Sequence, residues 1–380
     1  MRDVRAGLVI CSPGRGAFPR VSEIMHFPVK PNDKTRGTAM NTPDDDRHSI
    51  NRRNFLAGTA AVGAASLLGI PCADAAELPP EISRIRIVHT PVVCFAPIYV
   101  AAEMLRLEGF TEVEYVKPGN EGNVGLLTAG SADIAMAGAT AVMLPIDAGE
   151  PVRVIGGMHA GCWELMANDR INTIRDLKGK AIAITGTGGL DHVFIASMMA
   201  YVGMDPRIDV KWITTQKMSE SMRLFAEGEV EAFLAFAQQP VELRAKRIGR
   251  TLINTTLDRP WSQYFCCMAI AHPRFIQQYP VATKRALRAF LKAADVCTRD
   301  PERVARLMRA NGHASEYETI LEVLKGLPYD VWRRDDPADT LRFHALRLHE
   351  VGMIKSTPQK LVAQGTDWRF LNELKKELKA

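Results

Sequence analysis

A short apolar run that leads through a glycine-rich bend into a helical pattern restricts the fold of this chain more than any other segment. Residues 181–184 are apolar and bounded by turn residues, which is typical of a strand buried on both faces. Glycines within 186–189 follow at once, and apolar residues then recur at helical spacing over 190–201. Such a junction leaves backbone N–H groups unpaired, so it can bind an anion or a carbonyl group. The same residues also fit a tight turn that binds nothing.

This bend differs from the nucleotide-binding motifs that also place glycines between a strand and a helix. Gly186 and Gly188 begin a Gly-x-Gly pattern, but Asp191 occupies the position of the third glycine of a dinucleotide fingerprint. The Gly-Lys-Ser/Thr of a P-loop does not follow either. The net charge of +5 is mild, and no block of Lys and Arg is interleaved with aromatic residues. We therefore expect neither a nucleotide cofactor nor a nucleic-acid partner.

The N-terminal segment is expected to be a targeting signal rather than part of the fold. An Arg-Arg pair precedes an uncharged run of small apolar residues at 57–70, and an Ala-x-Ala cleavage pattern ends at Ala75. Together these features predict a twin-arginine signal peptide at 51–75. The polar residues 1–50 are expected to form a disordered leader, in which Met40 is a possible start.

The signal predicts that the mature protein begins near Ala76 and works in the periplasm. The apolar run before it is too short, and too rich in alanine and glycine, for a membrane span. Cys72 follows Pro71, at a position where a lipid-attachment motif needs a small residue. We therefore do not expect a lipid anchor.

Strands and helices are expected to alternate through the first part of the mature chain. The sequence predicts strands at 84–89, 113–116, 133–137 and 152–155, separated by helices at 97–107, 123–129 and 140–148. Alternation at this spacing predicts a parallel, doubly wound sheet.

A second copy of this pattern follows. Residues 223–232 repeat the order of 125–134, which is the end of a helix, a glycine, a small linker and an acidic residue that starts a strand. Two copies so far apart predict two similar lobes rather than a solenoid. Further strands are expected at 210–213, 250–253 and 265–271, and helices at 281–296, 301–310, 316–324, 339–351 and 368–378. Two α/β lobes with a helical tail imply an architecture with a cleft.

Four phrases of the sequence, taken in order, carry a family resemblance. They are residues 96–101, 128–135, 176–180 and 228–232. The set resembles periplasmic substrate-binding proteins of the nitrate/sulfonate/taurine ABC importer class, whose wider superfamily includes the pyrimidine-synthesis proteins of thiamine metabolism. The resemblance covers residues 85–250 well and the helical tail in outline.

The resemblance implies an α/β, two-lobed type II periplasmic-binding-protein fold with two crossing hinge segments, near 160–167 and 258–271, and a C-terminal helical tail. The first lobe is expected at 84–160 plus 270–380, and the second at 161–269. It also implies a monomeric solute receptor, without catalytic or metal-binding residues, that delivers a small organic molecule or anion to an ABC permease and its ATPase. The ligand is expected at the carboxyl ends of the strands, and the lobes close on it by a hinge motion.

Matching the loops of this family to the chain gives the candidate ligand-binding residues, with backbone N–H groups at two opposed helix starts as the main contacts. The first lobe contributes Cys94, Phe95, Asn120, Glu121, Ala139 and Thr140. The second lobe contributes Gly188, Gly189, His192, Thr215, Gln216 and Gln238. Three aromatic residues in or beside the crossing segments are expected to wall the ligand or to belong to the core: Trp163, Trp261 and Tyr264.

The chain departs from this family in ways that bear on the ligand. Many sulfonate or nitrate binders have Ser or Thr before the helix that begins near Pro97, whereas this chain has Cys94 and Phe95. Glu121 would repel a sulfonate if it pointed inward, and His192 could favour an anion only when protonated. These departures favour an uncharged, aromatic or amine-bearing ligand.

Two other functions fit parts of the sequence. An enzyme of the thiamine-pyrimidine type could use His89, His159, Cys162, Cys266 or Cys267, because a catalytic pair needs a nucleophile and a base. The export signal argues against that enzyme, because such biosynthesis belongs in the cytoplasm. None of the seven cysteines has Cys-x-x-Cys spacing, so we interpret these residues as core or site-lining rather than as metal ligands. A periplasmic partner that presents a ligand to a membrane sensor would use the same clamp.

Overall fold

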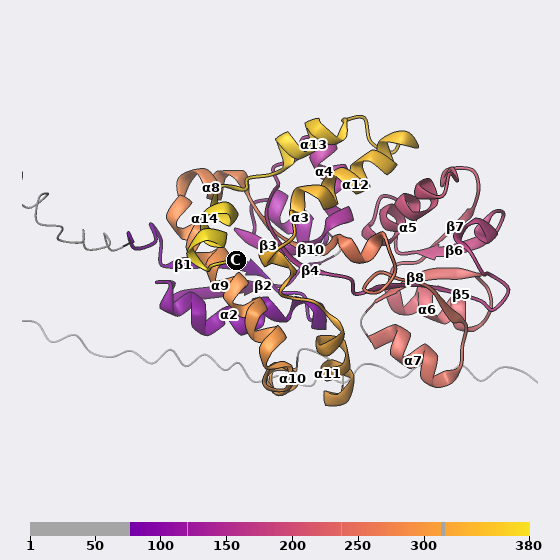
Figure 1. Ribbon diagram of the computed structural model, residues 1–380, viewed down its shortest axis with the longest axis horizontal. Helices are drawn as coiled ribbons and strands as arrows, with labels where there is room; N and C mark the ends of the chain where they lie inside the picture. The colour runs from indigo at the N-terminus through magenta and orange to yellow at the C-terminus, as the bar shows by residue number, and fades with distance from the viewer. Residues whose placement is uncertain (1–76, 120, 237, 313–315) are drawn as a thin grey trace, which may run out of the picture. The chain divides into compact units, whose positions relative to one another are not determined.

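The computed structural model describes residues 77–119, 121–236, 238–312 and 316–380. The predicted leader and signal peptide, and the candidate residue Asn120, lie outside these ranges. Within them the chain forms two five-stranded sheets that are flanked by helices (Figure 1).

The first sheet has the strand order β2-β1-β3-β10-β4. Its strands are β1 (Arg84–Val88), β2 (Glu112–Val116), β3 (Ile134–Gly138), β4 (Arg153–Ala160) and β10 (Phe265–Ala271). The helical segments that connect them are η1 (Val93–Phe95), α2 (Ala96–Leu107), α3 (Gly122–Thr128), η2 (Ala139–Val142) and α4 (Met143–Asp147). β3 and β10 are buried along their whole length, as the continuous apolar run of residues 265–271 indicates.

The second sheet has the equivalent order β7-β6-β8-β5-β9. Its strands are β5 (Trp163–Ala167), β6 (Ala181–Ile184), β7 (Lys211–Thr214), β8 (Ala232–Phe236) and β9 (Arg250–Asn254). The connecting segments are η3 (Ile174–Leu177), α5 (Leu190–Tyr201), α6 (Met218–Ala226), α7 (Gln238–Lys246) and η4 (Trp261–Gln263). The predicted strand–bend–helix junction is therefore the step from β6 to α5.

Each sheet contains one antiparallel strand, which corrects the expectation of a wholly parallel sheet. β10 runs antiparallel to β3 and β4, and β5 runs antiparallel to β8 and β9. Parallel neighbours need a long crossover connection within one sheet. β5 and β10 are instead reached through short links from the other sheet, so each enters its sheet from the end that faces the cleft.

The repeated sequence pattern occupies the same position in both sheets. β3 and β8 follow α3 and α6, and each lies in the middle of its sheet. The acidic residue of each copy then accepts a backbone N–H of the neighbouring parallel strand. Asp133 accepts from Arg86 at 2.8 Å, and Glu231 accepts from Ala181 at 2.8 Å. In both lobes, the acidic residue of the repeat therefore holds the start of the central strand against its parallel neighbour.

The two links between the sheets lie side by side. Cys162, between β4 and β5, donates its backbone N–H to Thr256 Oγ1 at 3.2 Å, and Trp163 donates to Thr255 Oγ1 at 3.1 Å. Gly161, beside Cys162, has a φ of +75°, which favours glycine. These contacts join the two crossing segments into one connection.

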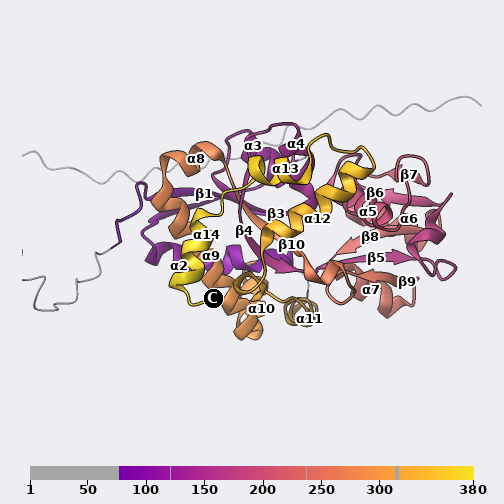
Figure 2. The same cartoon turned by 45° about the horizontal axis from the view of Figure 1, so that its top comes forward.

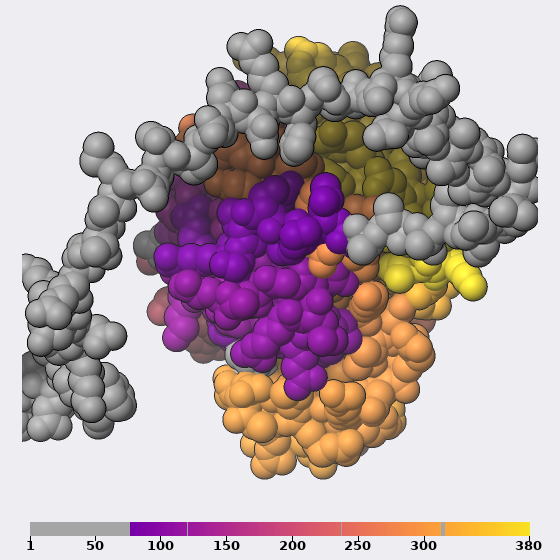
Figure 3. All heavy atoms as spheres, turned by 90° about the vertical axis from the view of Figure 1, so that its left-hand side faces the viewer, coloured from indigo at the N-terminus to yellow at the C-terminus, as the bar shows by residue number. Residues whose placement is uncertain are grey.

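Helices from the C-terminal part of the chain cover the first sheet and reach the second. They are α8 (Pro273–Gln278), α9 (Pro280–Arg299), α10 (Pro301–Ala310), α11 (Tyr317–Gly326), η5 (Val331–Arg333), α12 (Pro337–Glu350), α13 (Pro358–Gly365) and α14 (Arg369–Glu377). α9 packs against α2, and Figure 3 shows the orange C-terminal helices directly against the indigo and magenta segments. α12 extends to α5 of the second lobe (Figure 2).

A buried arginine ties three distant parts of the chain together beside α2 and α9. Arg288 of α9 contacts Glu77, Glu108 and Glu377, and its Nη1 lies 2.7 Å from Glu108 Oε2. Both Arg288 and Glu108 are buried. Although burial lowers it, hydrogen bonding to Glu77 and the nearby Glu108 raise the pKa of Arg288.

A buried histidine lies at the contact between α5 and α12. His344 Nδ1 is 2.9 Å from Ser197 Oγ, and its ring packs edge-on against Phe194 with ring centroids 5.2 Å apart. Burial lowers the pKa of His344 to about 3, because the charged imidazolium loses its hydration there.

This histidine should make the protein sensitive to mild acid. The unfolded chain binds a proton at His344 below about pH 6.5, whereas the folded chain does not until about pH 3. The contribution of His344 to the free energy of unfolding therefore falls as the pH drops, by about 2 kcal/mol between pH 7 and pH 5. Urea unfolding at both pH values, for wild type and His344→Gln, measures this. A variant whose loss of stability equals that of wild type would contradict the assignment.

Candidate ligand-binding cleft

A cleft of about 680 Å³ lies between the carboxyl ends of the strands of the two sheets. Its walls come from the segments after β1, β2 and β3 on one side, and after β6 and β8 on the other. This is the edge at which open α/β sheets place ligands, and the volume suits a small organic molecule.

Six of the candidate residues line this cleft: Cys94, Phe95, Glu121, Trp163, Gly188 and Gly189. Eight others lie outside its lining: Ala139, Thr140, His192, Thr215, Gln216, Gln238, Trp261 and Tyr264. Sequence reasoning missed several lining residues, among them Thr90, Asn123, Glu150, Asp191, Met218 and Phe236. Phe236 ends an apolar strand, so nothing in the sequence marks it as facing a cavity.

The two lobes touch at one side of the cleft. Thr140 Oγ1, on η2 of the first lobe, donates a hydrogen bond to the carbonyl of Leu190 on α5, at 3.2 Å. A Cβ added at Gly138 would lie only 2.3 Å from Leu190 Cδ1, so β3 ends directly against α5. Thr140 thus joins the two lobes instead of facing the cleft.

Several N–H groups of the glycine bend are paired from within, which corrects the expectation that they are free for a ligand. Asp191 accepts hydrogen bonds from the Thr185 N–H at 2.6 Å and from the Thr185 hydroxyl at 2.9 Å. The Gly188 N–H donates to His192 Nδ1 at 3.0 Å, and the Gly189 N–H donates to the Gly186 carbonyl. The carboxylate of Asp191 therefore occupies the place that a bound anion would take at this bend.

The titratable groups of the bend suit this internal role. Burial raises the pKa of Asp191, although the hydrogen bonds from Thr185 lower it. Burial also lowers the pKa of His192, whose Nδ1 accepts a hydrogen bond and so carries no proton. Its ring packs edge-on against Trp212, with centroids 4.7 Å apart. His192 supports the bend and offers no positive charge to a ligand.

Three other candidates beyond the bend are used in packing. Thr215 is buried, and its Oγ1 lies 2.8 Å from Ser221 Oγ. Tyr264 stacks on Phe343 of α12, with ring centroids 4.2 Å apart, and Trp261 packs against Tyr201 of α5. The aromatic residues of the second crossing segment therefore pack it against α12 and α5.

The cleft is mainly apolar and carries negative charge. Trp163 and Phe236 form an aromatic wall, with ring centroids 4.9 Å apart. Glu121, Glu150 and Asp191 also line the cleft, whereas the described lining contains no Lys or Arg. The Gly119 N–H lowers the pKa of Glu121, so this carboxylate stays charged at neutral pH.

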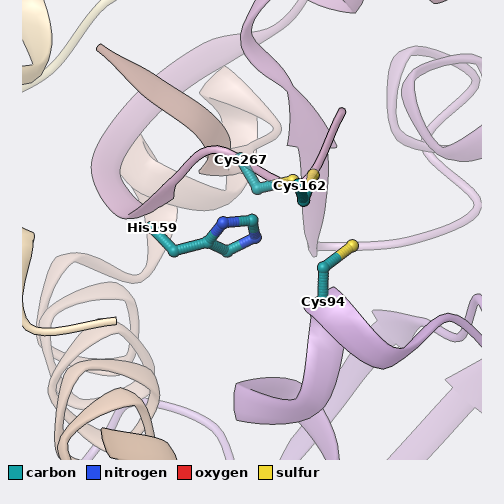
Figure 4. Close-up of side chains that lie close together, drawn as sticks. All are labelled: Cys94, His159, Cys162 and Cys267. Carbon is teal, nitrogen blue, oxygen red and sulfur yellow. The ribbon is translucent and has the colours of Figure 1, made fainter. Parts of the chain in front are cut away.

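Four thiol or imidazole side chains meet in the wall of the cleft. Cys94, His159, Cys162 and Cys267, here called the thiol cluster, come from η1, β4, the first link and β10, and their ligand atoms lie within 4.8 Å of one another. Figure 4 shows the ring of His159 facing the three sulfur atoms. Cys94 and Cys267 line the cleft.

The close packing of the thiol cluster shifts the pKa of several of its members. Burial alone would lower the pKa of His159, but the neighbouring Cys267 raises it to about 10. Cys266 adjoins the cluster, with its Sγ 2.8 Å from Cys162 Sγ. Although burial raises it, the hydrogen bonds of neighbouring thiols bring the pKa of Cys266 down to about 7.

Comparison with models of protein families shows the family to which the chain belongs. A model described as NMT1/THI5 like matches residues 94–304, which is more than half of the chain and includes most of the cleft. The chain belongs to the NMT1/THI5-like family. A search of curated proteins found no match.

Solved structures share the fold of this NMT1/THI5-like chain. The periplasmic nitrate-binding protein NrtA from Synechocystis PCC 6803 matches with a TM-score of 0.67 and 16% identity, over 80% of this chain and 90% of that chain. The alkanesulfonate-binding protein SsuA from Xanthomonas axonopodis pv. citri, bound to MOPS, matches with a TM-score of 0.62 and 17% identity, over 76% and 99%. The desulfurization enzyme DSZB matches with a TM-score of 0.55 and 16% identity, over 78% and 100%. These likenesses confirm the predicted periplasmic-binding-protein fold.

The export signal is confirmed as well. A model of the twin-arginine translocation signal sequence matches residues 49–69 of this NMT1/THI5-like protein, which overlaps most of the predicted signal at 51–75. The protein is thus exported to the periplasm. In the part of the chain that the structure describes, no helix combines the length and the apolar character that crossing a membrane requires.

Proposed function

We propose that this protein is the solute-binding component of an ABC importer, and that its cleft captures an uncharged or cationic small organic molecule for the permease and ATPase. The observation that carries this proposal is a cavity of about 680 Å³ with walls from both lobes, in an exported chain. A ligand that touches both walls favours the closed arrangement, which is the signal that a permease would recognise. The nitrate and alkanesulfonate binders of the same fold support the importer role.

The lining argues against nitrate or a sulfonate as the ligand here. Glu121, Glu150 and Asp191 place carboxyl groups in the lining of the cleft, and the described lining contains no Lys or Arg that could pair with an anion. The bend that could have bound an anion already holds the carboxylate of Asp191. The Trp163–Phe236 wall instead offers a flat apolar surface and a π-face, which suit an aromatic or amine-bearing ligand.

A thermal-shift screen of the mature protein tests this function. The panel contains aromatic amines, neutral pyrimidines, aromatic acids, nitrate and alkanesulfonates. Binding to the folded state raises the melting temperature with ligand concentration, so an amine or a neutral aromatic compound should raise it where nitrate and sulfonates do not. A melting temperature that no member changes would contradict the proposal, and a shift by nitrate or sulfonate alone would overturn the ligand class.

Trp163→Ala should weaken the binding of the best compound in this panel. Loss of the aromatic wall removes contacts worth about 2 kcal/mol, which is about a 30-fold increase in Kd. Trp212→Ala is the matched control, because Trp212 packs on His192 outside the cleft lining. Isothermal titration of both variants gives the comparison. Equal losses in the two variants would mean that Trp163 does not contact the ligand.

Catalysis is the competing function, and one specific observation favours it. DSZB shows that an enzyme can have this fold, and the thiol cluster places sulfur beside an imidazole in the cleft wall. We infer that the protein binds without turnover, because the imidazole of His159, the base that such a nucleophile would need, is fully buried and cannot contact a substrate in the cleft. Mass spectrometry of the ligand recovered after incubation should show it unchanged. A product formed in more than one equivalent per chain would establish an enzyme.

A further inference from the structure

We propose that the thiol cluster is a binding site for one soft or borderline metal ion of the Zn²⁺ or Cu⁺ class. Three sulfur atoms and one imidazole are a ligand set that such ions prefer, whereas Mg²⁺ and Ca²⁺ require oxygen ligands. The ligand atoms of Cys94, His159, Cys162 and Cys267 lie within 4.8 Å of one another. A tetrahedral zinc site with Zn–S bonds of about 2.3 Å needs sulfur atoms about 3.8 Å apart. The cluster therefore needs only a small contraction around an ion.

The second observation is a buried ring nitrogen that has no partner. His159 is fully buried, and its Nε2 makes no hydrogen bond with any described residue. Its Nδ1 lies 3.2 Å from the carbonyl oxygen of Ala160, to which it can donate a proton. Metal-binding histidines commonly donate one ring N–H to a backbone carbonyl, which fixes the ring and directs the other nitrogen at the ion. A metal at the cluster would satisfy a group whose burial is otherwise costly.

Backbone geometry and access also suit an ion. Cys162 has a φ of +86°, although it is not a glycine, and this conformation is unusual for such a residue. Strained positions of this kind cluster at functional sites, and here the side chain joins the other three ligands (Figure 4). Cys94 and Cys267 line the cleft, so an ion can enter from there. The ligands come from η1, β4, the first link and β10, of which η1 and β10 are far from the others in sequence, and this explains why no short sequence motif marks the site.

Oxidation is the competing fate of these thiols. Cys162 Sγ lies 2.8 Å from Cys266 Sγ, and the periplasm favours disulfides. A disulfide between them would remove Cys162 from the ligand set. The Cys266→Ser variant separates the two possibilities, because it prevents this disulfide and keeps all four proposed ligands.

Metal binding to the mature protein, purified under reducing conditions, tests the site without any organic solute. Wild type and Cys266→Ser should each retain one Zn²⁺ per chain through gel filtration. With Co²⁺ as the probe, both should give thiolate-to-metal charge-transfer absorption and the strong visible bands of a tetrahedral site. Cys94→Ser and His159→Gln should bind at least 100-fold more weakly. Cys297→Ser is the matched control, because Cys297 is a buried free cysteine outside the cluster, and it should bind as wild type does.

The outcomes are decisive in either direction. Zn²⁺ or Co²⁺ binding that is equally strong in Cys94→Ser and His159→Gln would overturn the site, as would Cys266→Ser protein with free thiols that binds neither ion. If a ligand variant fails to fold by circular dichroism, the thiolate charge-transfer absorption of the Co²⁺-loaded wild type still decides, because its absence excludes cysteine ligation. These readouts are independent of the solute screen, so the failure of one proposal leaves the other standing.

Discussion

Replacing Gly161 with alanine is expected to lower the free energy of unfolding by about 3 kcal/mol. Two effects act together at this position. Its φ of +75° strains any residue with a Cβ, and the added Cβ would lie 2.1 Å from Thr256 Oγ1 and 2.8 Å from Thr256 Cα. The second contact is with backbone, so a side-chain rotation cannot relieve it. The two links between the lobes would have to move apart.

Gly179→Ala is the control for this change. Gly179 also has a φ of +75°, but a Cβ there would meet nothing within 4 Å. This variant isolates the backbone cost, which we expect to be about 1 kcal/mol. Urea unfolding of both variants measures the difference. Similar losses in the two would show that the links can separate at little cost, which the close packing at Thr256 makes unexpected.

Arg288→Met is expected to have an effect of comparable size, about 3 kcal/mol. Methionine keeps most of the apolar stem of Arg288 but leaves the buried Glu108 without its 2.7 Å partner. Removing one partner from a buried ion pair is costly because the other charge stays desolvated. Lys292, at 3.2 Å from Glu108, compensates in part. The loss should therefore lie near the lower end of the range for broken buried pairs.

An exposed arginine provides the comparison for this variant. Arg84 contacts Glu112 and Glu114 on the surface of the first sheet, so Arg84→Met should leave the stability nearly unchanged. The loss in Arg288→Met should also persist in high salt, because salt screens buried pairs weakly. Unfolding curves for both variants at low and high ionic strength check this. A loss that disappears in salt would show that Glu108 is hydrated.

The fold was predictable from the sequence because its signals are local. Residues 181–184 form a buried strand and residues 190–201 a helix, as apolar periodicity and glycine indicate. The repeat at 223–232 indicated the second sheet, because an acidic residue at the same place in each copy accepts a backbone N–H where a strand begins. Residues 163–167 were expected only as a crossing segment, yet they form β5. Their pairing with β8 and β9 is a long-range contact that no local pattern reports.

The cleft was only partly predictable, because side-chain direction depends on neighbours that are distant in sequence. His192 and Thr215 follow the carboxyl ends of strands, as expected, but Trp212 and Ser221 hold them inside the second lobe. In the sequence, Asp191 only showed that the bend is not a nucleotide-binding motif. The structure adds that its carboxylate accepts hydrogen bonds within the bend. The thiol cluster could not be predicted either, because Cys94 and Cys267 are far in sequence from its other two residues and meet them only in the folded chain.

The contact between α12 and α5 has a mechanical consequence. The lobes are joined by two adjacent chain segments, and two further contacts hold them: His344 packs against Ser197 and Phe194, and Thr140 bonds to Leu190. These contacts restrict the relative rotation of the lobes more than the two links alone would. The ligand-free protein then loses less conformational entropy when the lobes close, so the same set of contacts should give a lower Kd.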